Sequence, residues 1–219
     1  FIDGLVAGEG EAALLSILDM EYTAGSDISD FNNFLPLPYL SPGFILPYSA
    51  SIGCYWRRCA FCPEQAEANP YRPIAFHRVV SQLKSLVRSL KPVLVHFTDN
   101  ALSPALLKAL VRDPCGVPWY GFVRITRHLT DPDFCNVLKR SGCVMLQIGL
   151  ESGSQKVLDG FCKGIELKIA QKVLKNLKHV GIAAYVYLLF GTPWETEADA
   201  ERTLDFTVRH SEAVTFLNL

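Results

Sequence analysis

The sequence lacks long apolar runs and any excess of one charge, and both absences limit what the chain can be. None of its hydrophobic stretches reaches the roughly 20 residues that a membrane-spanning helix needs, and no secretory signal is visible. A net charge of −1 in 219 residues argues against a protein-wide electrostatic field for nucleic acid or for an anionic membrane. We therefore expect no membrane span, and a nucleic-acid partner is disfavoured, with a local basic patch around Arg57, Arg58 and Arg72 as the open alternative.

Cysteine is present, but not in the pattern of a secreted, disulfide-bonded protein. The chain has seven cysteines, an odd number, and three of them fall within nine residues. This usage favours a reducing, cytoplasmic compartment. The remaining composition, 49% hydrophobic and 20% charged, is that of an ordinary globular domain. Because the chain starts at Phe1 and stops at Leu219 within an apolar run, we expect a fragment truncated at its C-terminus.

The most informative stretch is residues 54–62, with the sequence CYWRRCAFC, which we call the cysteine loop. Its three thiolates, from Cys54, Cys59 and Cys62, are soft ligands that suit zinc or an iron–sulfur cluster. A structural zinc site would normally have a fourth ligand close by, but the next cysteine is Cys115 and the nearest histidine is His77. Three ligands leave one metal position open for chemistry. A non-catalytic zinc module remains the alternative.

Apolar strand candidates alternate with helical patterns from residue 44 onward. The expected strands are Phe44–Ile52, Val93–Thr98, Trp119–Ile125, Val144–Leu150, Ala183–Phe190 and Val214–Leu219. The expected helices are Phe76–Leu90, Pro104–Val111, Asp131–Arg140, Leu167–Val180 and Glu197–His210. Strands this apolar are typical of a parallel sheet buried on both faces. Six β/α steps with right-handed crossovers predict an α/β fold, a partial (β/α)6 TIM-like barrel.

Three segments are predicted along the chain. Residues 1–22 indicate a short strand end followed by a helix from Ala12 to Tyr22, which we interpret as the C-terminal end of an upstream α/β domain. Residues 23–43 are rich in Gly, Ser, Asn, Asp and Pro and predict an ordered linker. Residues 44–219 form the barrel domain.

In TIM-like barrels the active site gathers at the carboxyl ends of the strands, so the residues that follow each expected strand are candidates. The cysteine loop follows the first strand. Polar or turn-forming residues follow the next four: Asp99, Arg124, Glu151 with Ser152, and Gly191 with Pro193. Each also has a purely structural interpretation, such as a turn for Asp99 or an ion pair for Arg124.

The three cysteines, with Phe61 just before the third, resemble the radical S-adenosylmethionine (SAM) superfamily, from about Pro47 to Leu219. The usual spacing places three residues between the first two cysteines, whereas this chain has four. Further segments are similar to the branch that carries an N-terminal cobalamin-binding domain. These are Gly8–Glu11, Gly149–Ser154 with Leu158 and Lys163-Gly164, and Phe190–Thr196.

The resemblance implies that Cys54, Cys59 and Cys62 hold a 4Fe–4S cluster whose open iron is chelated by SAM. One electron from the cluster would cleave SAM to a 5′-deoxyadenosyl radical. The candidate SAM contacts are Phe61 for the adenine, Asp99 for the ammonium, Arg124 for the carboxylate, Glu151 and Ser152 for the ribose region, and Gly191 and Pro193 for close backbone approach.

The resemblance also implies partners and a wider context. We expect a small-molecule substrate, an electron donor such as a flavodoxin or ferredoxin, and a full-length protein that is a cobalamin-dependent methyltransferase or another enzyme acting on a carbon centre. Cobalamin is expected in the full-length protein and not in this fragment. A radical SAM enzyme without cobalamin is the nearest alternative. We interpret the remaining four cysteines as packing residues and His96 as a hydrogen-bonded core histidine.

Overall fold

The computed structural model describes residues 10–19 and 40–219. The chain divides into two compact units, residues 1–38 and 39–219. In the first unit the helix α1 (Glu11–Ile17) is shorter than the predicted Ala12–Tyr22. The expected strand end before it and most of the expected linker lie outside the described residues.

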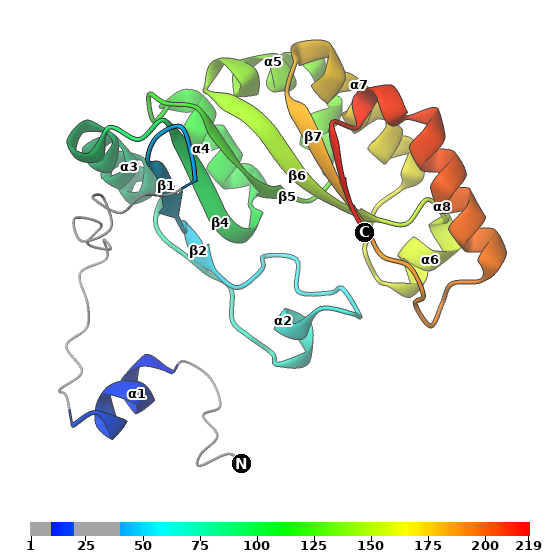
Figure 1. Cartoon of the computed structure of the whole chain (residues 1–219), viewed down its shortest axis with the longest axis horizontal. Helices are drawn as coiled ribbons and strands as arrows, with labels where there is room; N and C mark the ends of the chain where they lie inside the picture. Colours follow the sequence, from blue (N-terminus) through cyan, green and yellow to red (C-terminus); the bar gives the residue numbers. More distant parts are fainter. Residues whose placement is uncertain (1–9, 20–39) are drawn as a thin grey trace. The chain divides into compact units, whose positions relative to one another are not determined.

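The second unit is built on one six-stranded parallel sheet (Figure 1). Its strands, in spatial order, are β1 (Ile45–Tyr48), β4 (Leu94–Leu102), β5 (Trp119–Val123), β6 (Cys143–Glu151), β7 (Ala183–Leu188) and β8 (Phe216–Asn218). Neighbours in the sheet are consecutive β/α steps, as in a barrel that has not closed. The predicted partial TIM-like barrel is confirmed.

Helices follow the strands and cover the outer face of the sheet (Figure 1). They are α3 (Phe76–Leu90), α4 (Pro104–Arg112), α5 (Pro132–Arg140), α7 (Leu167–Val180) and α8 (Glu197–Arg209). Local signals set their limits. Asp131 caps α5 by accepting from the Asp133 amide at 2.9 Å, and Gly181 ends α7 with a left-handed φ of 72°. The bounds of α3 and α7 are those predicted from the sequence.

Several short elements were not predicted. They are the helices α2 (Pro63–Ala66) and α6 (Gln155–Gly160), the strands β2 (Ser51–Ile52) and β3 (Arg72–Pro73), and the 3₁₀ turns η1 (Arg127–Thr130) and η2 (Ser211–Ala213). The expected strand Phe44–Ile52 breaks after Tyr48, because β2 leaves the sheet to pair antiparallel with β3. The cysteine loop and α2 lie, in sequence, between the two strands of this ribbon. No described helix is long and apolar enough to cross a membrane.

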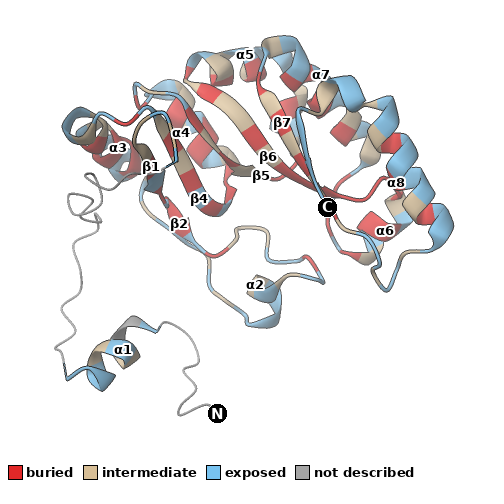
Figure 2. Ribbon diagram, in the orientation of Figure 1, coloured by how far each residue is buried: buried red, intermediate tan, exposed pale blue. Residues whose placement is uncertain are grey.

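The expectation that the strands are buried on both faces was wrong. Along β6, Leu146, Ile148 and Leu150 are buried against the helices, whereas Met145 and Gln147 on the other face are half-buried. Figure 2 shows the same alternation of buried and intermediate residues along the neighbouring strands. The hydrophobic core therefore lies between sheet and helices, and the inner face of the sheet stays partly open to solvent.

Candidate active site

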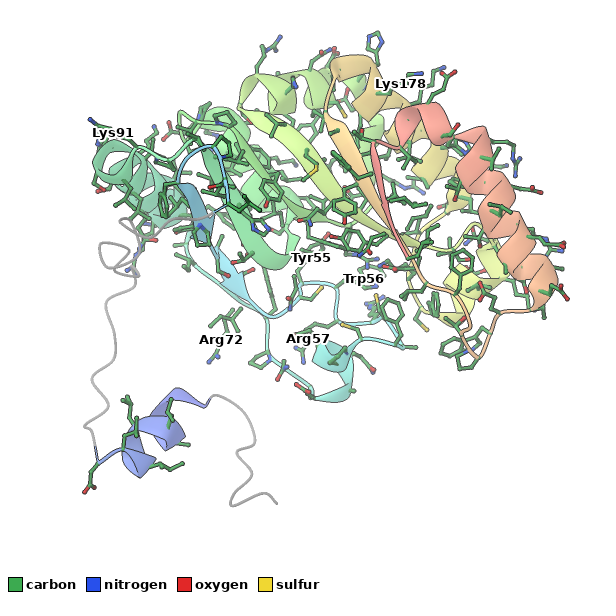
Figure 3. The ribbon with its side chains drawn as sticks, viewed as in Figure 1. Tyr55, Trp56, Arg57, Arg72, Lys91 and Lys178 are labelled. Atoms are coloured by element: carbon green, nitrogen blue, oxygen red, sulfur yellow. The ribbon has the colours of Figure 1, made fainter. Side chains whose placement is uncertain are left out.

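A pocket of about 560 Å³ lies where the cysteine loop meets the carboxyl ends of the strands. It is lined by Cys54, Cys59, Phe61, Cys62, Pro63, Glu64, His96, Phe97, Thr98, Asp99, Asn100, Ala101, Phe122, Arg124, Gln147, Glu151 and Lys163. We call it the cysteine pocket. Figure 3 labels Tyr55 and Trp56 on the loop beside the sheet. The structure thus brings together seven of the ten residues predicted for the site.

The cysteine loop is held by its own backbone and by the segment after α6. Gly53, which precedes the loop, has φ +75°, and a Cβ there would lie 2.5 Å from the Pro70 carbonyl oxygen. Within the loop, the Cys62 amide donates to the Cys59 carbonyl at 3.1 Å, and the Ala60 amide donates to the Phe161 carbonyl at 2.9 Å. Residues distant in sequence therefore fix the position of the thiols.

Cys59 is the buried member of the three thiols and lies beside two cations. Arg124 Nη1 is 3.5 Å from its Sγ. Burial raises the pKa of the Cys59 thiol, while the positive charges of Lys163 and Arg124 act to lower it. A thiolate at this position is thus opposed by desolvation and supported by charge. Such cationic surroundings suit a group whose thiolate ligands carry negative charge.

Arg124 does not pair with a carboxylate of a neighbouring strand, which was its structural interpretation. Its second guanidinium nitrogen donates to the Lys163 carbonyl, and the guanidinium carbon lies 4.2 Å from the centre of the Trp56 ring. Trp56 Nε1 in turn donates to the Cys162 carbonyl at 3.2 Å. Arg124 therefore fastens the cysteine loop to the segment that follows α6.

Glu151 ends β6 in a strained, left-handed conformation with φ +68°. Its Oε1 accepts from Lys163 Nζ at 2.5 Å, and both side chains are less than 8% exposed. Glycine at 149 leaves room for the pair, because a Cβ there would lie 2.4 Å from Glu151 Oε1. In the sequence, Lys163 stands out only within the Lys163-Gly164 pair that resembles the cobalamin-binding branch. No sequence pattern indicates that it pairs with Glu151.

Ser152 does not line the cysteine pocket. Its fully buried hydroxyl lies 3.0 Å from the Thr203 hydroxyl, which also accepts from the Gly153 amide at 2.9 Å. Ser154 next donates to Asp199 Oδ1 at 2.8 Å. These contacts tie the turn after Glu151 to α8.

Asp199 is the centre of that connection. Its carboxylate accepts from the hydroxyls of Thr196 and Ser154, and these hydrogen bonds hold its pKa far below the usual range. Thr196 and Asp199 also form a capping box at the start of α8. No sequence pattern singles out Asp199 beyond its place in the first turn of a helix.

Asp99 lies in the cysteine pocket and is buried. Its two oxygens accept from the Ala50 amide at 2.9 Å and from the Ser51 hydroxyl at 2.5 Å. Burial raises the pKa of the carboxyl, and these hydrogen bonds partly oppose the shift. Asp99 thus also joins β4 to the point where β2 leaves the sheet, so it combines a turn-fixing role with a place in the pocket.

Phe61 is 39% exposed at the pocket, and its ring packs edge-on against Phe161 with centroids 4.9 Å apart. Phe161 also packs against Trp194, at 5.4 Å. Gly191 and Pro193 do not line the pocket. Both are exposed, and the Gly191 amide donates to Glu195 Oε2 at 2.6 Å. Trp194 is the residue through which this turn contacts the site.

Three further pocket residues, His96, Phe122 and Gln147, come from the inner face of the sheet. His96 stacks on Tyr120, with centroids 4.3 Å apart and ring planes 6° apart, and burial lowers its pKa. The interpretation of His96 as a core histidine missed its place in the pocket. Cys162 also differs from expectation, because it is exposed, whereas Cys115, Cys135 and Cys143 are buried.

Within residues 10–19 and 40–219, no three His, Cys, Asp or Glu side chains are close enough to hold a single metal ion. A 4Fe–4S cluster makes a different demand, since each thiolate binds a separate iron.

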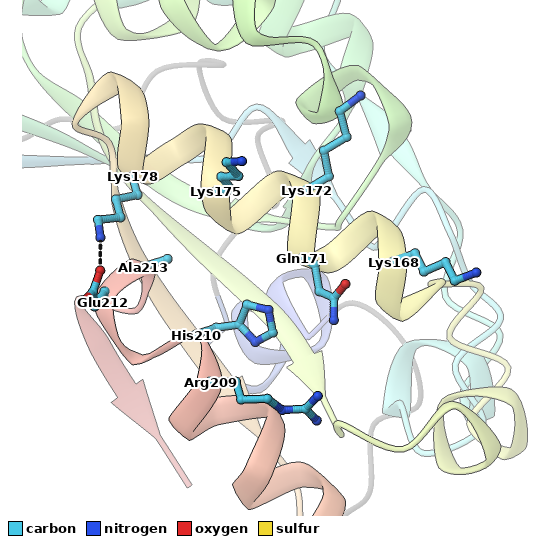
Figure 4. Close-up of a pocket in the computed structure, with 9 residues that line it drawn as sticks. All are labelled: Lys168, Gln171, Lys172, Lys175, Lys178, Arg209, His210, Glu212 and Ala213. Atoms are coloured by element: carbon cyan, nitrogen blue, oxygen red, sulfur yellow. Dashed lines mark hydrogen bonds and ion pairs between the residues drawn. The ribbon is translucent and has the colours of Figure 1, made fainter.

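A second pocket, of about 460 Å³, lies between α7 and the α8–η2 segment (Figure 4). Its cations include Lys168, Lys172 and Arg209, and it shares no residue with the cysteine pocket.

Residues 48–207 match the sequence family described as the Radical SAM superfamily, and this match spans most of the chain. This chain belongs to the radical SAM superfamily. The matched region contains the cysteine loop and every strand-end residue of the candidate site. This family match weighs against the alternative interpretation of the cysteine loop as a non-catalytic zinc module.

The radical SAM chain is also similar to individual proteins. It is 27% identical over 176 residues to bacteriochlorophyllide d C-12(1)-methyltransferase of Chlorobaculum tepidum, covering 76% of this chain and 38% of that protein. Its fold resembles the methyltransferase TsrM of Kitasatospora setae, solved with tryptophan substrate and a SAM analogue (TM-score 0.67, 23% identity, 81% and 36% of the chains). It also resembles the cobalamin-dependent radical enzyme OxsB with aqua-cobalamin and SAM bound (TM-score 0.64, 19% identity, 81% and 28%). The chain thus spans less than two fifths of each.

Proposed function

We propose that this chain is the cluster- and SAM-binding part of a radical SAM enzyme of the cobalamin-dependent methyltransferase type. One observation carries the proposal: a single pocket collects the three thiols of the cysteine loop and charged side chains from three separate strand ends. The charged groups have opposite signs, Asp99 and Glu151 against Arg124 and Lys163. A zwitterionic nucleoside ligand offers matching groups for both signs.

The three thiols would hold the cluster. Their donor set is soft, and Arg124 and Lys163 place positive charge beside Cys59. When bound, the cluster supplies the electron that cleaves SAM reductively to a 5′-deoxyadenosyl radical. The role of the chain is to hold the thiols and exclude water, and the buried position of Cys59 serves both.

The remaining residues would orient SAM. Lys163 holds Glu151 Oε1 in place, so that the carboxylate can accept from ribose hydroxyls without reorientation. Asp99, fixed by Ala50 and Ser51, would pair with the ammonium group. Arg124 would reach the SAM carboxylate from its position above Trp56. Phe61 offers an exposed ring edge to the adenine. Gly191 and Pro193 would act through the turn that carries Trp194.

The subclass of the proposal, a cobalamin-dependent methyltransferase, has two supports: the Chlorobaculum relative and TsrM are methyltransferases, and OxsB is a cobalamin-dependent SAM radical enzyme. Cobalamin would bind outside this fragment, because the chain covers only part of those relatives. The substrate would be a small molecule. A flavodoxin- or ferredoxin-like donor would supply the electron.

Anaerobic reconstitution with iron and sulfide tests the proposal. We expect about four irons per chain and an electron paramagnetic resonance signal that changes when SAM is added. Cys59→Ala should lose most of the cluster, whereas the matched control Cys115→Ala, a buried cysteine outside the pocket, should keep it. Tight zinc binding without a response to SAM, or equal iron in the two variants, would refute the assignment.

A further inference from the structure

The inner face of the sheet carries rings where a closed barrel carries aliphatic packing. Interiors of TIM barrels are filled by layers of Val, Ile and Leu. At the corresponding positions, β4, β5, β7 and β8 carry His96, Tyr120, Phe122, Tyr185, Tyr187 and Phe216, which we call the aromatic face. The first five are half-buried and Phe216 is 52% exposed.

The rings form one continuous surface. The strand register pairs His96 with Tyr120, and Tyr185 with Phe216. His96 lies flat on Tyr120, and Tyr185 is stacked on Tyr187 with centroids 4.8 Å apart. Phe122 packs against Tyr187 at 5.2 Å. The stacked pairs cover each other's faces, so the parallel sheet holds neighbouring rings side by side with their edges free to pack against the face of a further ring.

The aromatic face is continuous with the cysteine pocket, because His96 and Phe122 belong to both. A molecule lying on the aromatic face would thus reach the place where the proposed radical forms. This continuity favours a substrate-binding surface over a surface that another segment of the protein would cover.

The aromatic face carries no charged side chain. Along the described strands, inner positions below Asp99, Arg124 and Glu151 hold no Asp, Glu, Lys or Arg. Burial lowers the pKa of His96 and raises those of Tyr120 and Tyr187, so that all three favour their neutral forms near pH 7. The face therefore suits an uncharged ring system.

One polar pair could orient such a ligand. Gln147 Nε2 donates to the Tyr187 hydroxyl at 2.8 Å, which leaves the Gln147 carbonyl for another partner, while the Tyr187 hydroxyl is also hydrogen-bonded to Tyr185. A ring substituent with a hydrogen-bond donor would match the Gln147 carbonyl. The pair lies on the same inner face as the rings.

We propose that the substrate is a flat, conjugated ring system that packs on the aromatic face, against the ring edges, and extends into the cysteine pocket. The inference rests on the proposed function, because it assumes that the reaction takes place in that pocket. It names the chemical class of the substrate and assigns its binding surface to Tyr120, Phe122, Tyr185 and Tyr187.

Two matched probes test the inference: 1-naphthaleneacetamide and its decahydro analogue, which has the same amide and the same carbon skeleton without π electrons. Calorimetry with the reconstituted, SAM-loaded protein should show about threefold to tenfold tighter binding of the aromatic probe. Tyr120→Leu should remove that preference, and Tyr185→Leu should reduce it. The control Phe134→Leu, a half-buried ring on α5, should keep it.

Equal or tighter binding of the saturated probe would overturn the inference, as would no binding of either probe. A second copy of the chain seated on the face would appear as a dimer that the probe does not dissociate, and that result would also overturn it. Circular dichroism confirms that each variant is folded. Failure of the proposed function has a different signature, because the cluster would then not respond to SAM while the cluster-free chain still preferred the aromatic probe.

Discussion

The buried pair of Lys163 and Glu151 permits a sharp test of the site. Lys163→Met removes one partner and leaves a carboxylate whose side chain is 7% exposed without its cation. Breaking a buried pair in this way costs about 3–5 kcal/mol of the free energy of unfolding. The exposed pair of Lys178 and Glu212 has the same 2.5 Å distance, with side chains 49% and 85% exposed. Lys178→Met should therefore cost only about 0–1 kcal/mol.

Urea unfolding of the cluster-free chain under reducing, anaerobic conditions measures both costs, with the fluorescence of the buried Trp119 as one probe. The double variant Lys163→Met, Glu151→Gln should recover part of the loss, because it leaves a buried amide, costing about 1–3 kcal/mol, instead of a buried charge. Equal costs for Lys163→Met and Lys178→Met would refute the reasoning. So would a double variant whose loss equals the sum of the single variants.

Three further predictions follow from the contacts around the site. Arg124→Gln should raise the pKa of the Cys59 thiol further, because it removes one of the two cations that lower it; alkylation of Cys59 followed against pH should shift to higher pH, and an unchanged profile would contradict the prediction. Asp199→Asn should lower the free energy of unfolding at pH 7. The difference in that free energy between variant and wild type should shrink as the pH falls below about 4, because a carboxyl with a depressed pKa in the folded state loses its contribution when it is protonated. A difference in unfolding free energy that stays constant from pH 7 to 3 would be evidence against the prediction. Gly164→Ala should cost about 1–3 kcal/mol by urea unfolding, since the residue has φ +65° and a Cβ there would lie 2.3 Å from the Trp56 ring, whereas Gly116→Ala, also at positive φ but with open space, should cost less.

The sequence predicted the main elements of the barrel because their signals are local. The helix from Phe76 to Leu90 follows from its 3.6-residue periodicity, and the end of α7 from Gly181. The convergence of Cys54, Asp99, Arg124 and Glu151 followed from topology alone, since parallel strands bring their carboxyl ends to one side of the sheet.

What the sequence could not predict depends on distant contacts. Lys163 becomes part of the site only because α6 returns the chain to the end of β6, and no local pattern encodes that return. Ser152 looked like a pocket residue by its position after the strand, but Thr203 on α8 draws its hydroxyl away. The half-open inner face was missed for another reason: Tyr and Phe count as apolar in a strand pattern, so their half-buried positions were taken for buried ones.

The two strands at the edges of the described sheet are unequal, and this has a practical consequence for handling the protein. β1 carries Pro47, a residue that edge strands use to discourage pairing with another chain. β8 has no such protection: Phe216 and Leu217 are 52% and 43% exposed, and the strand bears no charge. An apolar, uncharged edge is a template for strand addition. For a chain of residues 1–219 at high concentration we therefore expect self-association through β8, and Leu217→Lys should relieve it.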